Sequence, residues 1–375
     1  MKIRWGILST AEIARKNWKA ILNSGNGVVT AVASRDGKRS RDFIAICQAD
    51  APFPQAPKAL DSYEAVLADK EVDAVYLPLP TGLREDWVIR AAQAGKHVLS
   101  EKPCARSVAG LRKVLDTCKQ NGVQFLDGVM FMHSRRLQRM EEVLNDGTSV
   151  GQIKRITSAF SFGASPEFFQ DNIRAHSELE PFGCLGDLGW YCIRFALWAM
   201  KFQLPRQVSG RLLSELRRQD SPASVPAEFS GELLFDGGVS SGFYCSFVTE
   251  LQQWAHVSGT KGSLLVSDFV LPDRGSEIAF EVCKPIYHIE GCDFDMDPGI
   301  RRMVVEEHSH GHASAQETNL FRNFANQIRS GRLNEAWPEM ALKTQQVMEA
   351  CLASARADGR LLDVGQTELH SRPER

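Results

Sequence analysis

A short apolar run in the first third of the chain ends in residues that could do chemistry. Residues 97–100 (HVLS) are followed by Glu101, Lys102 and Pro103. Proline has no N–H to give to a strand ladder, so the predicted strand must stop before it. Open parallel sheets bind their ligands at such strand ends, which predicts that Lys102 lies at the mouth of a site. The alternative is a solvated Glu-Lys pair in a surface loop.

Asp187 and Tyr191 form a second candidate pair. A spacing of four puts both residues on one face of a helix, and an aspartate at a helix start suits the macrodipole. A phenol has a pKa of about 10 in water, so it needs help to act as a base near neutrality. A nearby lysine ammonium would give that help by stabilising the phenolate. The alternative is an interfacial tyrosine beside a capping aspartate.

The first predicted strand leads into a turn that fits the pattern Gly-x-Gly-x-x-Gly/Ala, with Ser9, Ala11 and Ala14 at the three small positions. Small side chains allow a pyrophosphate to approach the N-terminus of the following helix, where unpaired N–H groups favour anions. Both glycines of the ideal pattern are replaced. An ordinary tight turn between strand and helix is the alternative.

The second predicted strand ends in Ser34, Arg35 and Asp36, with Arg39 close behind. A carboxylate at the strand end would select NAD through the ribose 2′-OH, but serine stands there. A guanidinium can hold a 2′-phosphate with two hydrogen bonds. The sequence therefore favours NADP(H), with NAD(H) as the alternative, since Asp36 could still serve a ribose.

Strands and helices alternate regularly in the first part of the chain. The expected strands cover residues 3–8, 28–33, 73–80, 97–102 and 123–128, and the expected helices cover residues 12–22, 85–94 and 108–121. Alternation at this pitch predicts βαβ crossovers and a parallel sheet that is covered on both faces.

The pattern changes after a predicted helix at residues 135–145. The chain then alternates as antiparallel strands do, and residues 236–238 (DGG) give a hairpin signal. The expected strands of this part are residues 154–162, 207–216, 228–235, 239–247, 256–258 and 264–267. A helix at residues 186–200 is expected to lie across the sheet, and residues 315–357 are expected to be helical again.

Five segments, taken together and in their order along the chain, resemble the motifs of a known protein family. They are residues 5–14 (WGILSTAEIA), 72–80 (VDAVYLPLP), 94–103 (AGKHVLSEKP), 186–191 (GDLGWY) and 354–360 (SARADGR). With them the chain resembles the Gfo/Idh/MocA oxidoreductase family. Within that family it is similar to the branch of the dimeric dihydrodiol dehydrogenases and NADP-dependent xylose dehydrogenases.

The resemblance implies an α/β fold with an N-terminal Rossmann-type doubly wound parallel sheet. An α+β domain with a large open, mainly antiparallel sheet would follow. The implied domains are residues 1–131 for dinucleotide binding, 132–314 for substrate binding and oligomerisation, and 315–375 for C-terminal helices that return to the first domain. A homodimer or homotetramer through the open sheet is expected.

The resemblance also implies roles for individual residues. Lys102, Tyr191 and Asp187 would be catalytic, the Asp187 helix pointing its first turns at the nicotinamide opposite Lys102. The implied cofactor-binding residues are Ser9, Thr10, Ala11, Ile13, Ser34, Arg35, Arg39, Leu79, Pro80, Thr81, Glu101 and Lys102.

The chain departs from the family pattern after the third strand. The family often has Asn-x-x-His there, whereas this chain has Thr81 and Arg84. A fixed cation in place of a neutral imidazole hints at an anionic substrate. A solvated arginine at a helix start is the alternative.

Other candidates lie in loops. His133 follows the last strand of the first domain, and Asn172, Arg174 and His176 precede the Asp187 helix, so all four are candidate substrate contacts. His308, His310 and His312 alternate as metal ligands in an extended segment could, but no partner with clear ligand spacing accompanies them. No metal site is expected.

Composition limits the function classes. Lys and Arg number 44 against 46 Asp and Glu, which gives no reason to expect a nucleic acid or anionic membrane partner. No apolar run reaches the roughly 20 residues of a membrane span, and charged residues interrupt the first 25 residues, so no signal peptide is expected. The nine dispersed cysteines suit reduced thiols. We therefore expect a cytoplasmic protein.

These observations predict an NAD(P)-dependent dehydrogenase or reductase acting on CH–OH groups. It would transfer a hydride between nicotinamide and a carbinol carbon of a sugar, polyol or cyclic diol, with Lys102 and Tyr191 handling the proton. Two alternatives are a non-catalytic dinucleotide-binding sensor or regulator, and an NAD-dependent glycosidase of the same fold.

Overall fold

The computed structural model describes residues 2–365, which form two compact units. The first unit comprises residues 2–134, 178–181 and 308–342, and the second comprises residues 135–177, 182–307 and 343–365. The chain thus passes between the units several times. The division into domains at residues 1–131, 132–314 and 315–375 stays a prediction.

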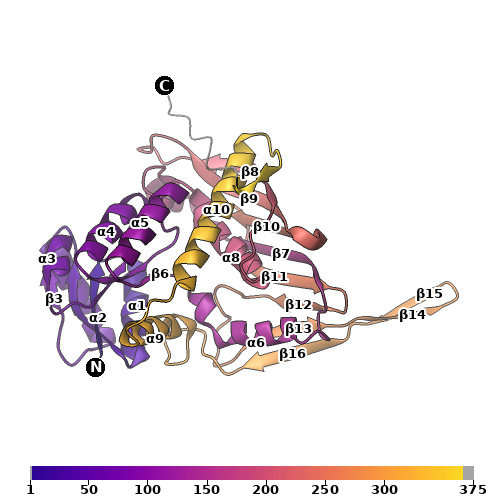
Figure 1. The fold of residues 1–375 in the computed structure, drawn as a ribbon, viewed down its shortest axis with the longest axis horizontal. Helices are drawn as coiled ribbons and strands as arrows, with labels where there is room; N and C mark the ends of the chain where they lie inside the picture. The colour runs from indigo at the N-terminus through magenta and orange to yellow at the C-terminus, as the bar shows by residue number, and fades with distance from the viewer. Residues whose placement is uncertain (1, 366–375) are drawn as a thin grey trace. The chain divides into compact units, whose positions relative to one another are not determined.

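A six-stranded, wholly parallel sheet forms the centre of the first unit (Figure 1). Its strands are β1 (Ile3–Leu8), β2 (Gly27–Ala33), β3 (Lys58–Leu60), β4 (Ala74–Leu77), β5 (His97–Ser100) and β6 (Phe125–Asp127). Their order in the sheet, β3-β2-β1-β4-β5-β6, is that of a dinucleotide-binding Rossmann fold, with the order reversing beside β1. The predicted fold class of the N-terminal part is confirmed.

Helices connect these strands, and side chains cap several of them. They are α1 (Glu12–Ser24), α2 (Gly37–Asp50), α3 (Tyr63–Ala68), α4 (Thr81–Gln93), α5 (Val108–Gln120), a 3₁₀ turn at Met130–His133 and α9 (Gln316–Arg329). Asp36, Ser62 and Ser107 accept hydrogen bonds from first-turn N–H groups of α2, α3 and α5. Such caps satisfy donors that have no partner inside the helix.

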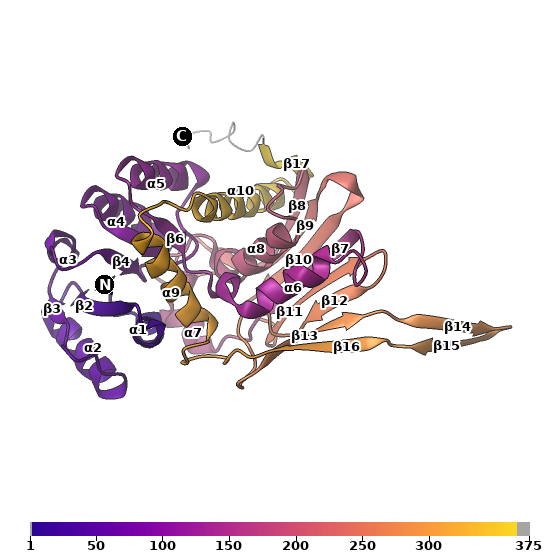
Figure 2. The ribbon, with the colours of Figure 1, turned by 60° about the horizontal axis from the view of Figure 1, so that its bottom comes forward.

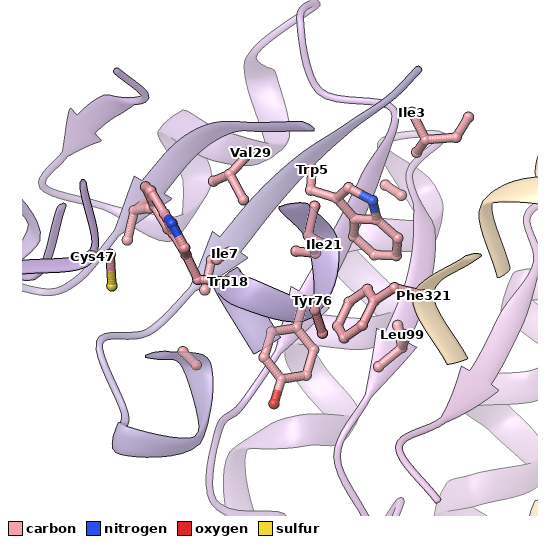
Figure 3. Packing of buried hydrophobic residues seen from close by; sticks show 14 of the residues in the cluster. Ile3, Trp5, Ile7, Trp18, Ile21, Val29, Cys47, Tyr76, Leu99 and Phe321 are labelled. Carbon is pink, nitrogen blue, oxygen red and sulfur yellow. The ribbon is translucent and has the colours of Figure 1, made fainter. Parts of the chain in front are cut away.

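Aromatic side chains from distant parts of the sequence meet in the core of the first unit (Figure 3). The rings of Trp5 in β1 and Phe321 in α9 pack edge to face with centroids 5.1 Å apart. Tyr76 in β4 meets the same Phe321 ring at 5.7 Å. All three side chains are fully buried. The late helix α9 is therefore part of the same hydrophobic core as the first strand.

The second unit is built on a nine-stranded sheet in the order β16-β13-β12-β11-β7-β10-β9-β8-β17, with antiparallel pairs everywhere except β7–β10. The strands are β7 (Ile153–Ser161), β8 (Gln207–Leu216), β9 (Val225–Leu234), β10 (Ser240–Ser246), β11 (Gln252–Gly259), β12 (Ser263–Val266), β13 (Ile278–Cys283), β16 (Ile300–Val305) and β17 (Leu362–Asp363). The predicted large, mainly antiparallel sheet is confirmed, and so is the β9–β10 hairpin, whose turn holds Gly237 and Gly238 at positive φ.

Helices α6 and α8 lie over one face of this sheet (Figure 2). The helices of this part are α6 (Arg135–Asn145), α7 (Pro166–Asp171) and α8 (Trp190–Ala199), with a 3₁₀ turn at Ile173–Ala175, and α10 (Ala336–Arg356) belongs to it from Lys343 onward. A separate two-stranded hairpin, β14 (Ile286–Glu290) and β15 (Asp293–Asp297), extends from the ends of β13 and β16. No helix among residues 2–365 is long and apolar enough to span a bilayer.

The structure differs from the sequence predictions at two helix starts. The helix expected from residue 85 begins at Thr81, directly after Pro80. The helix expected from residue 186 opens as a π-helical turn, Leu185–Gly189, before α8 begins at Trp190. A Cβ atom at Gly189 would come 2.9 Å from Leu185 Cδ1 and 3.1 Å from Cys245 Sγ of the sheet below, so this turn packs closely on the sheet.

We expect Phe321→Ala to lower the free energy of unfolding by about 3–5 kcal/mol, the usual cost of deleting a buried phenylalanine. The reason is the loss of its edge-to-face contacts with Trp5 and Tyr76 inside a closed core. Urea denaturation followed by circular dichroism measures the change. Arg329→Ala, on the exposed side of the same helix, is the control and should change stability by less than about 0.5 kcal/mol. Equal effects of the two substitutions would contradict this packing of α9.

Candidate active site

The register of the parallel sheet brings several strand ends to one edge of the first unit. Ile7 pairs with Tyr76, and Tyr76 pairs with Leu99 in the next strand. Parallel strands in such rows end together, so the residues that follow β1, β4 and β5 share one edge. These are the positions where Ser9, Thr81 and Lys102 were predicted to act.

The turn between β1 and α1 keeps a glycine-like backbone. Ser9 has φ +142°, in the region that favours glycine and is uncommon for other residues. Its hydroxyl accepts a hydrogen bond from the N–H of Ala11, 3.2 Å away, which stabilises the turn. Ala11 is the N-cap of α1 and provides no capping side chain. The helix start, with Thr10 before it and Ile13 in its first turn, thus presents uncapped N–H groups.

Cationic side chains gather near this turn. Arg35 and Arg39, which follow β2, are both exposed. Their charges act on the half-buried phenol of Tyr63, whose hydroxyl reaches the side chain of Ser9. Burial raises the pKa of Tyr63, and the two guanidinium groups oppose that increase. Ser34 closes the end of β2 by hydrogen bonding to both backbone groups of Asp36.

Tyr63 is a residue of this cluster that the sequence reasoning missed. It stands at the start of α3, and its ring packs edge-on against Trp87 with centroids 4.9 Å apart. A Ser62 cap preceding a short helical run was the available signal. The cluster therefore consists of the exposed side chains of Arg35 and Arg39, the phenol of Tyr63 and the turn at Ser9.

The start of α4 is held by a carboxylate from far along the chain. Leu79 and Pro80 lead from β4 into the helix, and the N–H and hydroxyl of Thr81 both donate to Glu180, at 3.1 and 2.5 Å. Glu180 thus caps α4, which explains why the helix starts four residues earlier than the sequence predicted. A cap supplied from residue 180 leaves no local signal.

Arg84 also contacts Glu180 and Thr81, and its side chain is buried rather than solvated. Its side chain is 6% exposed, and Nη2 lies 3.6 Å from Glu180 Oε1. Nη1 donates to the Thr81 hydroxyl at 2.8 Å and also to the carbonyl of Pro103. The guanidinium is therefore neutralised inside the first unit. Through Pro103 it holds the backbone that directly follows Lys102.

Glu101 and Lys102 leave the end of β5 on a braced backbone. Glu101 accepts a 2.7 Å hydrogen bond from the hydroxyl of Tyr76, which in turn accepts one of 2.6 Å from Asn17 of α1. Burial and the Glu101 carboxylate raise the pKa of Tyr76 well above its ordinary value, so the phenol remains a donor. Lys102 is 8% exposed, which places its stem inside the protein rather than in a surface loop.

Asp187 and Tyr191 lie in the second unit. Asp187 belongs to the π-helical turn and forms an ion pair with Arg174, whose Nε lies 2.6 Å from Oδ2. Tyr191, in the first turn of α8, packs edge-on against Phe160 of β7 at 5.7 Å. Asn172 caps the turn that carries Arg174, and His176 is buried just after it. Four predicted polar residues are thus gathered on the segment that leads to α8.

Three of the other candidate histidines contact side chains of the protein. His133 Nδ1 lies 3.1 Å from the side-chain nitrogen of Asn323, and its ring packs edge-on against Trp337. The rings of His308 and His312 stack at 3.6 Å, and His310 is exposed. Within residues 2–365, no three His, Cys, Asp or Glu side chains are grouped as metal ligands.

The β1–α1 turn fits a dinucleotide. Its backbone at Ser9 takes the conformation that a glycine-rich turn requires, and the thirteen-residue helix behind it lacks a capping side chain. Uncapped N–H groups at the positive end of a helix bind phosphate groups. Ser9, Thr10, Ala11 and Ile13 would hold the pyrophosphate, and the Arg35–Arg39 cluster would face the adenosine ribose.

Comparison with known proteins agrees with this geometry. Residues 3–128 match the family described as an oxidoreductase family with an NAD-binding Rossmann fold, and residues 137–265 match the GFO/IDH/MocA C-terminal domain. The chain is 33% identical to D-xylose 1-dehydrogenase (NADP(+)) 2 of Haloferax volcanii, over 69% of this chain and 74% of that protein. It is 30% identical to trans-1,2-dihydrobenzene-1,2-diol dehydrogenase of Mus musculus, over 72% and 77%.

Among solved structures, a 3-ketoreductase from Actinomadura kijaniata in complex with NADP and TDP-benzene has the same fold. The TM-score is 0.78 at 23% identity, with 94% of this chain and 98% of that chain covered. The fold and the matched domains define an NAD(P)-dependent oxidoreductase. The chain belongs to the Gfo/Idh/MocA family, as the sequence predicted.

We expect Glu180→Gln to lower the free energy of unfolding by about 3–5 kcal/mol, because it leaves the buried Arg84 cation without its countercharge. Adding Arg84→Met to Glu180→Gln removes that cation and should recover at least half of the loss, since apolar replacement of a buried pair is often near neutral. Urea denaturation of the single and double variants is the measurement. A double variant less stable than Glu180→Gln would show that the unpaired charge of Arg84 is not what destabilises the single variant.

Proposed function

We propose that the protein transfers a hydride between a nicotinamide dinucleotide and a carbinol carbon of a sugar, polyol or cyclic diol. The observation that carries this proposal is the buried Lys102 at the carboxyl end of β5, on a backbone braced by Tyr76 and Arg84. That strand end belongs to the edge where open parallel sheets bind their ligands. The similarity to a xylose dehydrogenase and a dihydrodiol dehydrogenase supports this substrate class.

NADP(H) is the proposed cofactor, with NAD(H) as the alternative. β2 ends in Ser34, whose hydroxyl is engaged by the backbone of Asp36, and no carboxylate occupies the strand-end position. Asp36 itself caps α2 through the N–H of Lys38. Arg35 and Arg39 are exposed beside the Ser9 turn and are suited to a 2′-phosphate.

Lys102 and Tyr191 are the proposed proton-handling residues. When bound, the nicotinamide supplies the hydride chemistry of the carbinol carbon. Lys102 would orient the reacting hydroxyl and lower its pKa. Tyr191 would take the hydroxyl proton during oxidation and return it during reduction. Asp187, held by Arg174, would position the start of the helix that carries Tyr191.

The proposed substrate is uncharged. Arg84 is neutralised by Glu180, so the cation that suggested an anionic substrate already has its partner. His133, Asn172, Arg174 and His176 remain the candidate contacts for substrate hydroxyls. Arg84 acts in this proposal by holding the Lys102–Pro103 backbone. A cytoplasmic homodimer or homotetramer through the open sheet completes the proposal.

Mass analysis and fluorescence of the purified protein test whether a dinucleotide is bound, and a panel of aldoses and polyols with NAD and NADP tests turnover. Net reduction of NADP by a sugar or diol supports the proposal. A tightly retained NAD without net turnover would instead indicate a glycosidase with transient oxidation. Dinucleotide binding without either activity would indicate a sensor.

We expect Arg35→Ala to weaken binding of NADP(H) by about 1.5–3 kcal/mol, the value of a lost charged hydrogen bond, with a much smaller effect on NAD(H). Lys38→Ala is the control, because the Lys38 ammonium is already paired with Asp42 at 2.9 Å. Titration of both dinucleotides into the three proteins is the measurement. Equal losses of NADP(H) and NAD(H) affinity would remove the phosphate-binding role of Arg35.

We expect Lys102→Ala and Tyr191→Phe each to reduce hydride transfer at least about a hundredfold, the low end of general acid–base contributions. If the two residues act as one unit, the double variant should be little slower than the poorer single variant. Stopped-flow transfer with a confirmed substrate measures the rates, and dinucleotide titration serves as the control, since cofactor affinity should change far less. A near-normal rate of hydride transfer in Tyr191→Phe would show that the hydroxyl of Tyr191 does not carry the proton and that its ring only packs against Phe160.

A further inference from the structure

Tyr76 in β4 is a buried titratable residue that the proposed proton transfer does not use. Its ring is fully buried and packs against Phe321 (Figure 3). Its hydroxyl accepts a hydrogen bond of 2.6 Å from the side-chain amide of Asn17 and donates one of 2.7 Å to Glu101 Oε1. Because the Asn17 amide donates to the phenol oxygen, the hydroxyl hydrogen is directed at the Glu101 carboxylate.

The Glu101 carboxylate is held from two sides. Tyr76 donates to it from β4, and Gly128 lies against it just after β6. A Cβ atom at Gly128 would come 3.2 Å from the carboxylate, so glycine leaves the room that the carboxylate occupies. A carboxylate accepts hydrogen bonds at both of its oxygens. The bond from Tyr76 engages Oε1, and Oε2 can accept from a ligand, since Glu101 is only half-buried.

Packing alone does not account for an asparagine at position 17. The side chain of Asn17 is fully buried, and within residues 2–365 no group donates a hydrogen bond to its Oδ1. A buried carbonyl oxygen without a donor lowers stability, and an apolar side chain would avoid that cost. Local rules of this kind are broken mainly where a function requires it. The hydrogen-bonded chain from Asn17 through Tyr76 to Glu101 therefore indicates a functional role.

The sheet topology assigns Glu101 to one half of a dinucleotide. The strand order reverses beside β1, and open sheets of this kind bind a dinucleotide across the reversal. Arg35 and Arg39, the proposed adenosine contacts, follow β2 on one side of β1. β4 and β5 lie on the other side, so a carboxylate after β5 stands where the second ribose would lie. Carboxylates at strand ends accept hydrogen bonds from ribose hydroxyls.

We propose that Tyr76 is a positioning residue for the cofactor, which fixes the Glu101 carboxylate so that Oε2 accepts from a hydroxyl of the ribose joined to the nicotinamide. Asn17 acts one step further back, because it orients the hydroxyl of Tyr76. This inference rests on the proposed nicotinamide-dependent function and adds that the nicotinamide half of the cofactor is positioned from inside the sheet. Both side chains are fully buried, so they act through Glu101.

Fragments of the cofactor separate this role from general damage to the fold. Tyr76→Phe should weaken binding of NADP(H) and of 2′-phospho-ADP-ribose, which both carry the second ribose, at least about tenfold, as expected when a hydrogen bond to a charged group is lost. Adenosine 2′,5′-bisphosphate lacks that ribose, so its affinity should be unchanged. Isothermal titration calorimetry measures the three affinities. NAD(H), ADP-ribose and ADP are the corresponding set if the wild type prefers NAD(H).

Tyr244→Phe is the matched control, because the Tyr244 hydroxyl also donates to a glutamate, Glu228, but in the second unit. It should change none of the three affinities. Gly128→Ala tests the carboxylate from the other side. The added Cβ atom displaces Glu101 while the Tyr76 hydroxyl is kept, so the same pattern of losses across the three ligands is expected.

The possible outcomes distinguish this inference from the proposed function. Unchanged NADP(H) affinity in Tyr76→Phe, with turnover of a sugar or diol by the wild type, would overturn the inference and leave the proposed function standing. Equal losses for all three ligands in Tyr76→Phe would also overturn it, since the effect would then not belong to the second ribose. A wild type that binds neither dinucleotide would overturn the proposed function and this inference together.

Discussion

The parallel register of β1, β4 and β5 is the constraint on which the candidate site of the first unit depends. Since Ile7, Tyr76 and Leu99 stand in one row, the three strands end together, and the residues after them reach the same edge. Tyr76 then adds a cross-link perpendicular to the strands. Its hydroxyl joins α1, through Asn17, to Glu101 after β5. The backbone before Lys102 is thus linked through Tyr76 to helix α1.

The β1–α1 turn shows that backbone conformation can persist where the sequence pattern has weakened. A serine at φ +142° is held in a region that L side chains avoid, at a cost of order 1–3 kcal/mol. The hydrogen bond from the Ala11 N–H to the Ser9 hydroxyl and the contact with Tyr63 offset part of that cost. What a phosphate requires of this turn is its N–H groups, and those are independent of the side chain at residue 9.

The sequence predicted the elements whose signals are local. Five of the six strands of the parallel sheet, together with α5 and α6, lie within a few residues of their predicted ranges because apolar runs and turn residues mark them, whereas the three-residue strand β3 was not predicted. Contacts between distant residues had no such signal. The π-helical turn before Trp190 packs closely over Cys245, and the Arg174–Asp187 pair joins a loop to a helix start.

The β14–β15 hairpin was missed for a different reason. Alternation of apolar and charged residues at 286–297 is visible in the sequence around Gly291 and is typical of a hairpin. What the sequence does not show is that all ten residues of the two strands are exposed, which follows from the position of the ribbon beyond β13 and β16.

Thr81 and Arg84 stand where the family often has Asn and His. The two residues are joined to each other and to Glu180 by hydrogen bonds and an ion pair, so they are best treated as one unit. A neutral imidazole can stand alone at a ligand edge, but a buried guanidinium requires a carboxylate, because the uncompensated charge would cost several kcal/mol. Glu180 meets that requirement and also caps α4 through Thr81. Nη1, which also donates to Thr81, donates to the carbonyl of Pro103. Arg84 therefore holds the backbone that directly follows Lys102.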